Sequence, residues 1–464
     1  MRFAIRVLLV VASVFIAGAA GAEAPKYIFV FIGDGMSSPQ RKVAEEFSVK
    51  TGSGRLAMNH LPEQACAITK SANSLVTDSA AAATAIACGV RTRNGSLGIT
   101  PDGKRVESVA EIAKKRGMKV GLISTVAIAH ATPAGFYAHR KSRGQHYRIG
   151  LDLIASGFDH FSGGGVFGDH NDKKCSDYRG DLFELAAKAG YEMAFNRAEW
   201  ERLGPGGKSW CVFGPHATGY DIDHDGKVPR LPALLEKCIS LIDNPAGFFI
   251  MCEGGMIDYA GHANDAATNV RDMLALDEAV KVASKFQDAH PDETLIITVG
   301  DHETGGMSMG FAGSGSKFKI ELLAGQKMSC EKYSSFVKRM IAKKKCEVTL
   351  DDLRPTLAEY FGLTVLSAAE ERMLVSALEN DIAKSRGKVA DTTHYMAARK
   401  YIFAKTAVNV LNARAGVSWS TGSHTALPVL VTAKGPGSDI LDGLTELSHI
   451  GIRLKKLVSG GETR

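Results

Sequence analysis

Short apolar segments of strand length recur along the chain, and each is followed by a residue that can bind a metal. The four segments and the residues that follow them are 27–32 with Asp34, 120–125 with Thr132, 247–252 with Glu253, and 295–299 with Asp301 and His302. Continuous apolar runs are typical of strands that are buried on both faces, as in a parallel sheet covered by helices. Ligands gather at the carboxyl ends of the strands in such sheets, so we expect these side chains to face one crevice.

Amphipathic segments of helical period lie between the apolar ones. They span residues 106–116, 182–189, 232–242 and 269–286. This alternation predicts an α/β fold with a doubly wound, largely parallel central sheet and helices on both faces. Residues 429–432 predict one further strand of the same sheet.

A long segment separates two of the candidate ligands, His302 and His424. It is far longer than an ordinary connection between two elements, and it contains several amphipathic helices between residues 351 and 412. We therefore expect an inserted subdomain at about 307–418, near the candidate site, within one catalytic domain that spans residues 23–464.

The first residues have the pattern of a secretory signal peptide. A basic start with Arg2 and Arg6 precedes an apolar run over 7–16 and a series of small residues. This predicts a signal peptide over 1–22 with cleavage after Ala22. An uncleaved anchor is the weaker alternative, because the apolar run is shorter than the ~20 residues that a bilayer span needs. We expect an exported protein, periplasmic or secreted, without a membrane span in the mature chain.

Composition and charge restrict the possible partners. Apolar residues make up 45% of the chain, which is typical of globular proteins and ample for a large core. A net charge of +6 spread over 464 residues does not indicate nucleic-acid specificity.

The eight cysteines are an even number, and export would permit disulfides, with Cys330–Cys346 and Cys175–Cys211 as possible pairs. Cys252 lies inside an apolar run and is predicted to be a buried free thiol. No Cys-x-x-Cys pair is present, which disfavours a zinc site made of thiolates.

Three imidazoles and several carboxylates form the candidate metal ligands. Asp258 and His262 stand four residues apart, so a helical turn would place both on one face, as a metal chelate requires. Asp301 and His302 form a second pair, and His424 is a third, isolated imidazole. Positions that include nitrogen ligands favour zinc, whereas a position made only of oxygen ligands suits magnesium.

Ser79 stands where a polar triplet opens an alanine-rich helix. The simpler interpretation is that Asp78 or Ser79 caps the helix, and on spacing alone the cap is the better one. The functional interpretation places the Ser79 hydroxyl at a helix N-terminus, which favours anions, beside a metal that activates it as a nucleophile.

Six motifs, taken together and in order, resemble the alkaline phosphatase family, and they extend from residue 28 to about 455. They are Phe31-Ile-Gly-Asp34-Gly-Met, Thr77-Asp78-Ser79-Ala80-Ala81, Ala131-Thr132-Pro133-Ala134, Glu253-Gly254-Gly255 with Ile257-Asp258 and His262, Gly300-Asp301-His302-Glu303-Thr304-Gly305-Gly306, and Ser423-His424-Thr425. The resemblance implies hydrolysis of small phosphomonoesters, two zinc ions and one magnesium ion, and a homodimer.

The resemblance also implies a role for each matching residue. Ser79 would be the nucleophile that forms a covalent phosphoserine, and Arg143 would clamp the phosphate. Arg140 is nearby, but the spacing from Thr132 favours Arg143. The implied metal groups are Ser79, Asp301 and His302 for one zinc, Asp258, His262 and His424 for the other, and Asp34, Thr132 and Glu253 for magnesium, with Asp34 shared with the first zinc.

Two positions depart from the family's pattern. His130 stands where some members have Asp, and Tyr259 stands where others have Lys, His or Trp. Both lie near the implied metals and phosphate, so we expect them to tune the third metal, the pH optimum and product release.

Other functions fit the sequence less well. A phosphodiesterase or sulfatase on the same scaffold is disfavoured by Glu253, Thr132 and Arg143, and alanines follow Ser79 where a sulfatase needs a Pro and an Arg. A periplasmic zinc- or phosphate-binding protein would leave the surroundings of Ser79 unexplained.

Two further segments are expected to be turns. Residues 221–226 resemble the start of a calcium loop, but Pro232 replaces the acid that position twelve requires, so a polar turn is the better interpretation. Residues 161–165 predict a tight turn from strand to loop.

Overall fold

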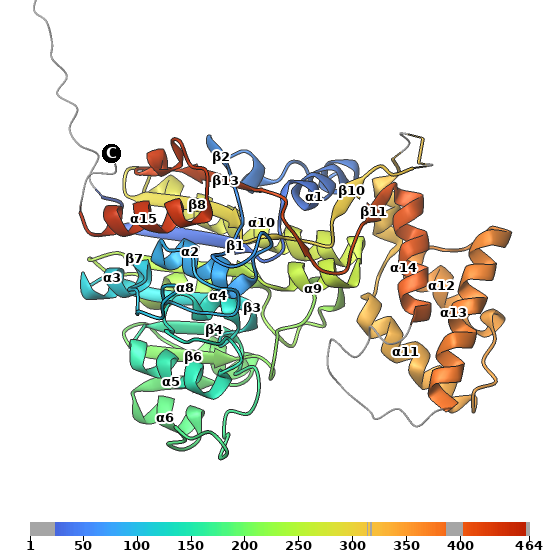
Figure 1. Cartoon of the computed structure of the whole chain (residues 1–464), viewed down its shortest axis with the longest axis horizontal. Coiled ribbons are helices and arrows are strands. Elements are labelled where there is room, and N and C mark those ends of the chain that lie inside the picture. Colours follow the sequence, from blue (N-terminus) through green and yellow to red (C-terminus); the bar gives the residue numbers. More distant parts are fainter. Residues whose placement is uncertain (1–23, 313, 316–317, 387–401, 461–464) are drawn as a thin grey trace, which may run out of the picture.

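A single large sheet organises the molecule. The computed structural model describes residues 24–312, 314–315, 318–386 and 402–460, so the predicted signal peptide lies outside the described residues. The nine strands, in spatial order, are β2 (Glu63–Ala67), β13 (Val429–Lys434), β8 (Thr294–Gly300), β1 (Tyr27–Gly33), β7 (Phe248–Gly254), β3 (Lys119–Ala127), β4 (His160–Gly164), β6 (Lys208–Val212) and β5 (Tyr191–Ala194) (Figure 1).

From β8 to β5 all neighbouring strands are parallel, and β13 runs antiparallel to both β8 and β2. The predicted doubly wound, largely parallel sheet is confirmed, and so is the strand predicted at 429–432. Each of the other apolar segments also forms a strand.

The two faces of the sheet carry separate cores. Phe29 and Phe31 of β1 point into one core, and Ile28 and Val30 point into the other, as the two-residue period of a strand requires. Every residue of β1 is buried, because helices cover both faces.

The first face is covered by α1 (Ser38–Lys50), α7 (Arg197–Arg202), α8 (Leu231–Ile242) and α10 (Ala266–Ala289). The second face is covered by α2 (Ser79–Cys88), α3 (Val109–Lys115), α4 (Ala131–Ala134), α5 (His146–Ser156), α6 (Leu182–Lys188) and α15 (Leu447–Val458). Short 3₁₀ helices span Ala57–Asn59, Asp221–Asp223, Ile320–Gly325 and Ser438–Leu441. The four helices predicted from their period correspond to α3, α6, α8 and α10.

A group of helices lies beside one end of the sheet (Figure 1). It follows β10 (Met307–Met309) and precedes β11 (Val417–Trp419), and these two strands pair with each other. Among the described residues its α-helices are α11 (Cys330–Lys343), α12 (Leu350–Phe361), α13 (Ala368–Arg386) and α14 (Ile402–Ala415). The buried carboxylate of Asp265 ties this group to the main body, since it accepts hydrogen bonds from Gln326 Nε2 and from the Cys330 amide.

Neither possible disulfide forms. All eight cysteines lie in the described part of the chain, and each is a free thiol. Cys330 is the first residue of α11 and Cys346 follows its last turn, so the 14-residue helix separates them by roughly 20 Å. Cys175 and Cys211 pack in the cores on opposite faces of the sheet. Cys252 is a buried thiol, as predicted.

The two segments expected to be turns differ in outcome. Residues 161–164 belong to β4 rather than to a turn, because the glycines there are accommodated inside the sheet. In the segment 221–226 the carboxylates of Asp221, Asp223 and Asp225 engage separate protein partners, which agrees with a polar turn. Among the residues that the structure describes, no helix combines the length and the apolar character that crossing a bilayer requires.

Candidate active site

The central strands end at the same edge of the sheet, and the predicted metal ligands lie at this edge. The last residues of β1, β7 and β8 pair with one another in register; they are Gly33, Gly254 and Gly300. Asp34 and Asp301 directly follow β1 and β8, and Glu253 is the penultimate residue of β7. Parallel pairing therefore brings together three carboxylates from distant segments of the chain.

Helices and a two-residue ribbon bring the remaining residues to the same edge. Thr132 lies in α4, Ser79 is the first residue of α2, Asp258 and His262 lie on α9 (Met256–Ala263), and His424 lies in β12 (His424–Thr425). β12 pairs antiparallel with β9 (Glu303–Thr304), which directly follows His302.

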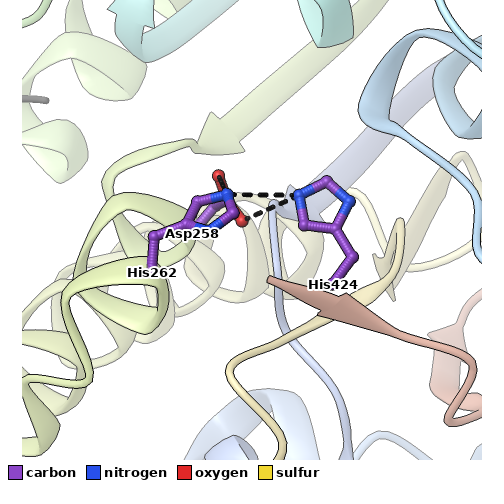
Figure 2. A group of neighbouring side chains, drawn as sticks. All are labelled: Asp258, His262 and His424. Atoms are coloured by element: carbon purple, nitrogen blue, oxygen red, sulfur yellow. Dashed lines mark hydrogen bonds and ion pairs between the residues drawn. The ribbon is translucent and has the colours of Figure 1, made fainter. Parts of the chain in front are cut away.

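Asp258, His262 and His424 form one compact group (Figure 2). His262 Nε2 lies 3.3 Å from Asp258 Oδ2 and 3.2 Å from His424 Nε2, and His424 Nε2 lies 3.6 Å from Asp258 Oδ1. The Nδ1 atoms donate to the carbonyl oxygens of Gly422 and Thr77, at 2.8 and 3.1 Å.

This arrangement of acceptor atoms is suited to binding a cation. A carbonyl oxygen only accepts, so both rings carry a proton on Nδ1, and in their neutral form each has a bare lone pair on Nε2. Two lone pairs and a carboxylate then face one another at short distance. Imidazole nitrogens with a carboxylate are ligands that zinc prefers, so the residues of this group fit that metal.

Ser79, His302, Asp301 and Asp34 form a second group, which is fully buried. Ser79 Oγ lies 3.3 Å from His302 Nε2, and the same nitrogen lies 3.3 Å from Asp301 Oδ2 and 3.4 Å from Asp34 Oδ1. Neither of these two carboxylate oxygens accepts a hydrogen bond from the described residues. The two carboxylate oxygens and His302 Nε2 thus converge with the Ser79 hydroxyl as the one donor of this group, an arrangement that suits a metal ion.

A third group surrounds the other side of Asp34. Thr132 Oγ1 donates to Asp34 Oδ2 at 3.4 Å, and Glu253 Oε2 accepts from Ser124 Oγ. Glu253 Oε1 is buried without a hydrogen-bond partner among the described residues, and the ring of His130 comes close enough to share a cation with Asp34 and Glu253. Oxygen ligands fit magnesium, and the imidazole adds a nitrogen that magnesium does not require.

Burial and like charge make these carboxylates unusual. Burial, reinforced by neighbouring carboxylates, raises the pKa of Asp34 and of Asp301 well above the usual range. Burial raises the pKa of Glu253 to about 7. Burial alone would also raise the pKa of Asp258, but His262 and His424 beside it hold that pKa well below its ordinary value. Cations would relieve the repulsion among these groups.

Arg143 is held close to Ser79. Its Nη1 donates to Asp78 Oδ2 at 3.1 Å, and its Nη2 donates to His130 Nε2 at 2.9 Å. Arg140, the other candidate for this role, instead makes a bidentate pair with Asp152. The geometry therefore favours Arg143 as the arginine that can reach a phosphate at Ser79.

The structure also resolves the two interpretations of the start of α2. Asp78 is the cap, because its Oδ1 accepts from the Ala81 amide at 3.0 Å. The Ser79 hydroxyl is therefore not used for capping and faces His302. Of the two departures from the family's pattern, His130 lies beside Arg143, and the Tyr259 ring lies 6.3 Å from the His130 ring.

Two residues of this site have no role in the sequence interpretation. Ser124 lies inside an apolar segment and holds Glu253. Thr304 belongs to the motif around His302, and its hydroxyl contacts Asp258 and His302. The sequence offers one weak signal for the contact between Ser124 and Glu253, which is the position of Ser124 near the end of a predicted strand.

Comparisons with known proteins agree on one family. The sequence model described as alkaline phosphatase matches residues 25–459. Alkaline phosphatase 3 of Bacillus subtilis is 30% identical over 442 residues, which cover 92% of this chain and 87% of that protein. Alkaline phosphatase 4 of the same organism is 31% identical over 387 residues, which cover 80% and 74%.

Solved structures show the same relationship. The cold-active alkaline phosphatase of Shewanella sp. superimposes with a TM-score of 0.78 at 26% identity, over 93% of this chain and 99% of that one. The alkaline phosphatase of Thermus thermophilus gives a TM-score of 0.77 at 27% identity, over 98% and 96%.

Proposed function

Because the chain belongs to the alkaline phosphatase family and is a phosphomonoester hydrolase, we propose that it works through a covalent phosphoserine at Ser79. One observation carries this proposal. The Ser79 hydroxyl, at the start of α2, lies 3.3 Å from His302 Nε2, and the neighbouring Asp78 holds Arg143. The proposed nucleophile, candidate metal ligands and a guanidinium group thus lie around the start of α2.

The reaction proceeds in two displacements at phosphorus. In the first, Ser79 Oγ forms a bond to phosphorus, the bond to the alcohol oxygen breaks, the hydroxyl proton passes to solvent and the alcohol takes one up. In the second, a water oxygen attacks phosphorus and loses a proton, the bond to Ser79 Oγ breaks and this oxygen takes up a proton, and inorganic phosphate leaves. The N–H groups at the start of α2 and the Arg143 guanidinium bind the phosphoryl oxygens throughout.

We propose two zinc ions and one magnesium ion as cofactors. The first zinc would be held by Ser79, Asp301 and His302, and the second by Asp258, His262 and His424. Magnesium would be held by Thr132 and Glu253, with Asp34 shared between it and the first zinc. When bound, these cations lower the pKa of the serine hydroxyl and offset the charge that develops on the phosphoryl, attacking and leaving oxygens.

His130 and Tyr259 are proposed to tune the third metal and product release. His130 is well placed for this because one ring nitrogen accepts from Arg143, while its other ring nitrogen, Nδ1, has no hydrogen-bond partner among the described residues. Any movement of the ring toward Asp34 and Glu253 would change how tightly Arg143 is held.

We also propose that the protein is exported and forms a homodimer. The basic start and apolar run of residues 1–22 support export to the periplasm or medium, and the resemblance of the six motifs supports a homodimer. Amino-terminal sequencing of the mature protein tests the first, with Glu23 expected as the first residue. Light scattering of the purified protein tests the second, with twice the mass of the mature chain expected.

Trapping of the phosphoenzyme tests the nucleophile. Protein incubated with a ³²P-labelled phosphomonoester and quenched in acid should carry label on Ser79. The S79A variant should carry none and should lose on the order of 10³-fold or more in kcat, while zinc remains bound. Undiminished labelling of the variant would show that another residue is the nucleophile. A substrate panel completes the test, and preference for a phosphodiester or a sulfate ester over a phosphomonoester would contradict the proposed substrate class.

A further inference from the structure

One hydroxyl group lies between the two groups that we propose to bind zinc. Thr304 is fully buried in β9, and its Oγ1 lies 2.5 Å from Asp258 Oδ1 and 3.2 Å from His302 Nδ1. Asp258 belongs to the group with His262 and His424, whereas His302 belongs to the group with Ser79. Thr304 is thus in contact with a ligand-type residue of each.

The direction of these hydrogen bonds follows from the chemistry of the three groups. A carboxylate only accepts, so the single hydroxyl proton of Thr304 is donated to Asp258. The Thr304 oxygen then accepts from His302, which must carry its proton on Nδ1. This tautomer leaves a lone pair on His302 Nε2, the atom that faces Ser79 Oγ and the carboxylates of Asp34 and Asp301.

Close packing holds the Thr304 side chain in this position. A Cβ atom at Gly35, whose φ is +73°, would lie 2.9 Å from Thr304 Oγ1, so this position needs glycine, and one at Gly261 would lie 3.1 Å from Thr304 Cβ, which is a tight contact. The backbone is fixed as well, because Thr304 O accepts from Gln40 Nε2 at 3.0 Å and Thr304 pairs with His424 across the ribbon. The hydroxyl therefore has a defined place.

We propose that Thr304 is a positioning residue that couples the two zinc groups, by orienting Asp258 and fixing the tautomer of His302 through one hydroxyl. The inference rests on the proposed function, since it requires both groups to bind zinc. Partners that orient metal ligands typically contribute 10- to 100-fold to metal affinity. Loss of this hydroxyl removes a partner from both groups at once.

Three variants of the full-length protein test the inference. T304V keeps the shape of the side chain without the hydroxyl, and T304S keeps the hydroxyl. T294V is the matched control, because Thr294 is equally buried, lies on the strand that leads to Asp301, and has a hydroxyl without a hydrogen-bond partner among the described residues. Zinc affinity is measured by titrating metal-free protein against a competing chelator.

We expect T304V to weaken zinc binding at both sites by about 10- to 100-fold, and T304S and T294V to stay within a few-fold of the wild type. Unchanged affinity in T304V, or a loss at one site only, overturns the coupling while the wild type still binds two zinc ions. A wild type that binds fewer than two zinc ions instead contradicts the proposed function.

A second measurement includes a test on the wild type alone, which does not depend on whether the variants fold. Nitrogen-15 NMR of the imidazoles of metal-free wild-type protein reports which ring nitrogen of His302 carries the proton. We expect Nδ1 to be protonated, and in T304V we expect this preference to be lost. A proton on Nε2 in the wild type overturns the inference.

Discussion

Arg143, the residue proposed to bind the phosphate, is oriented by two neighbouring side chains. Its guanidinium is held through Nη1 by Asp78 and through Nη2 by His130, so its fork is oriented before any phosphate arrives. Asp78 is itself fixed, since its two carboxylate oxygens accept from the amides of Ala81 and Gly95. Orientation in advance reduces the entropy that is lost when a phosphate is bound.

Replacement of Arg143 by lysine should therefore impair phosphate recognition. Lysine carries the charge but cannot match two phosphoryl oxygens at once. We expect R143K to lower kcat/KM for a phosphomonoester by about 10²-fold and to weaken inhibition by inorganic phosphate, as measured by steady-state kinetics. R140K is the control and should have little effect, because Arg140 is engaged by Asp152. A larger loss in R140K than in R143K would assign the clamp to Arg140.

The candidate metal and phosphate ligands could be found from the sequence, but the residues that hydrogen-bond to them could not. Asp258 and His262 were identifiable because four-residue spacing on a helix is itself the signal. Ser124 and Thr304 are ordinary hydroxyl residues within or just after strands. Their roles depend on hydrogen bonds to Glu253 and Asp258, and no local pattern encodes a contact with a distant segment.

At the scale of elements, α13 and α14 are joined by buried apolar side chains, by the Asp381 carboxylate, which accepts from the amides of Ile402 and Phe403, and by one charged pair. Glu370 accepts two hydrogen bonds from Arg414, at 2.8 and 2.7 Å, and further ones from Ser367. Arg414, aided by Ser367, lowers the pKa of Glu370 to about 2. A carboxylate with a depressed pKa stabilises the folded state fully above its unfolded value, and this contribution is lost as the pH falls toward 2.

The E370Q variant should accordingly be less stable at neutral pH. We expect a loss of about 1–2 kcal/mol in the free energy of unfolding, reduced from the full shift because the pair is partly exposed. Urea unfolding followed by circular dichroism measures it, and the difference from the wild type should shrink as the pH falls from about 4.5 toward 2. E371Q, which removes an exposed pair with Arg354, should change stability by less than about 0.5 kcal/mol. Equal losses in both variants would contradict the assigned role of Glu370.

Strand positions were predictable where strands are buried, and strand direction was not. The apolar run at 429–432 indicated a strand, yet β13 runs antiparallel to β8, and apolar content is the same in either direction. β2 was not predicted because it is an edge strand, exposed along most of its length, so its sequence carries no apolar run. The apolar segments at 27–32 and 295–299 form neighbouring parallel strands that are buried on both faces, which is typical of a parallel sheet covered by helices.

At the scale of the whole molecule, the proposed metal ions should contribute to stability as well as to catalysis. The carboxylates of Asp34, Asp301 and Glu253 are crowded and buried, and their raised pKa values mean that the folded, metal-free protein binds more protons than the unfolded chain. For Glu253 this holds between its unfolded value of about 4.3 and about 7. Stability of the metal-free protein therefore falls as the pH rises through this window.

Removal of metal should lower the melting temperature more at pH 8 than at pH 6. Ligand binding at 1,000 times its Kd stabilises a folded protein by about 4 kcal/mol per site, so the effect is easily measured. Differential scanning calorimetry with and without a chelator, followed by readdition of zinc and magnesium, provides the test. A melting temperature at pH 8 that does not respond to the chelator would contradict metal binding at these groups.

The position of β13 has a consequence for how the protein is made. This strand lies near the end of the chain but occupies the second place in the sheet, between β2 and β8. A growing polypeptide cannot join β2 to the sheet until residues 429–434 have been synthesised. His424 precedes this strand by a few residues, so its group with Asp258 and His262 stays incomplete for the same time. With the proposed export, the protein would then take up its cations after it has left the compartment where translation occurs.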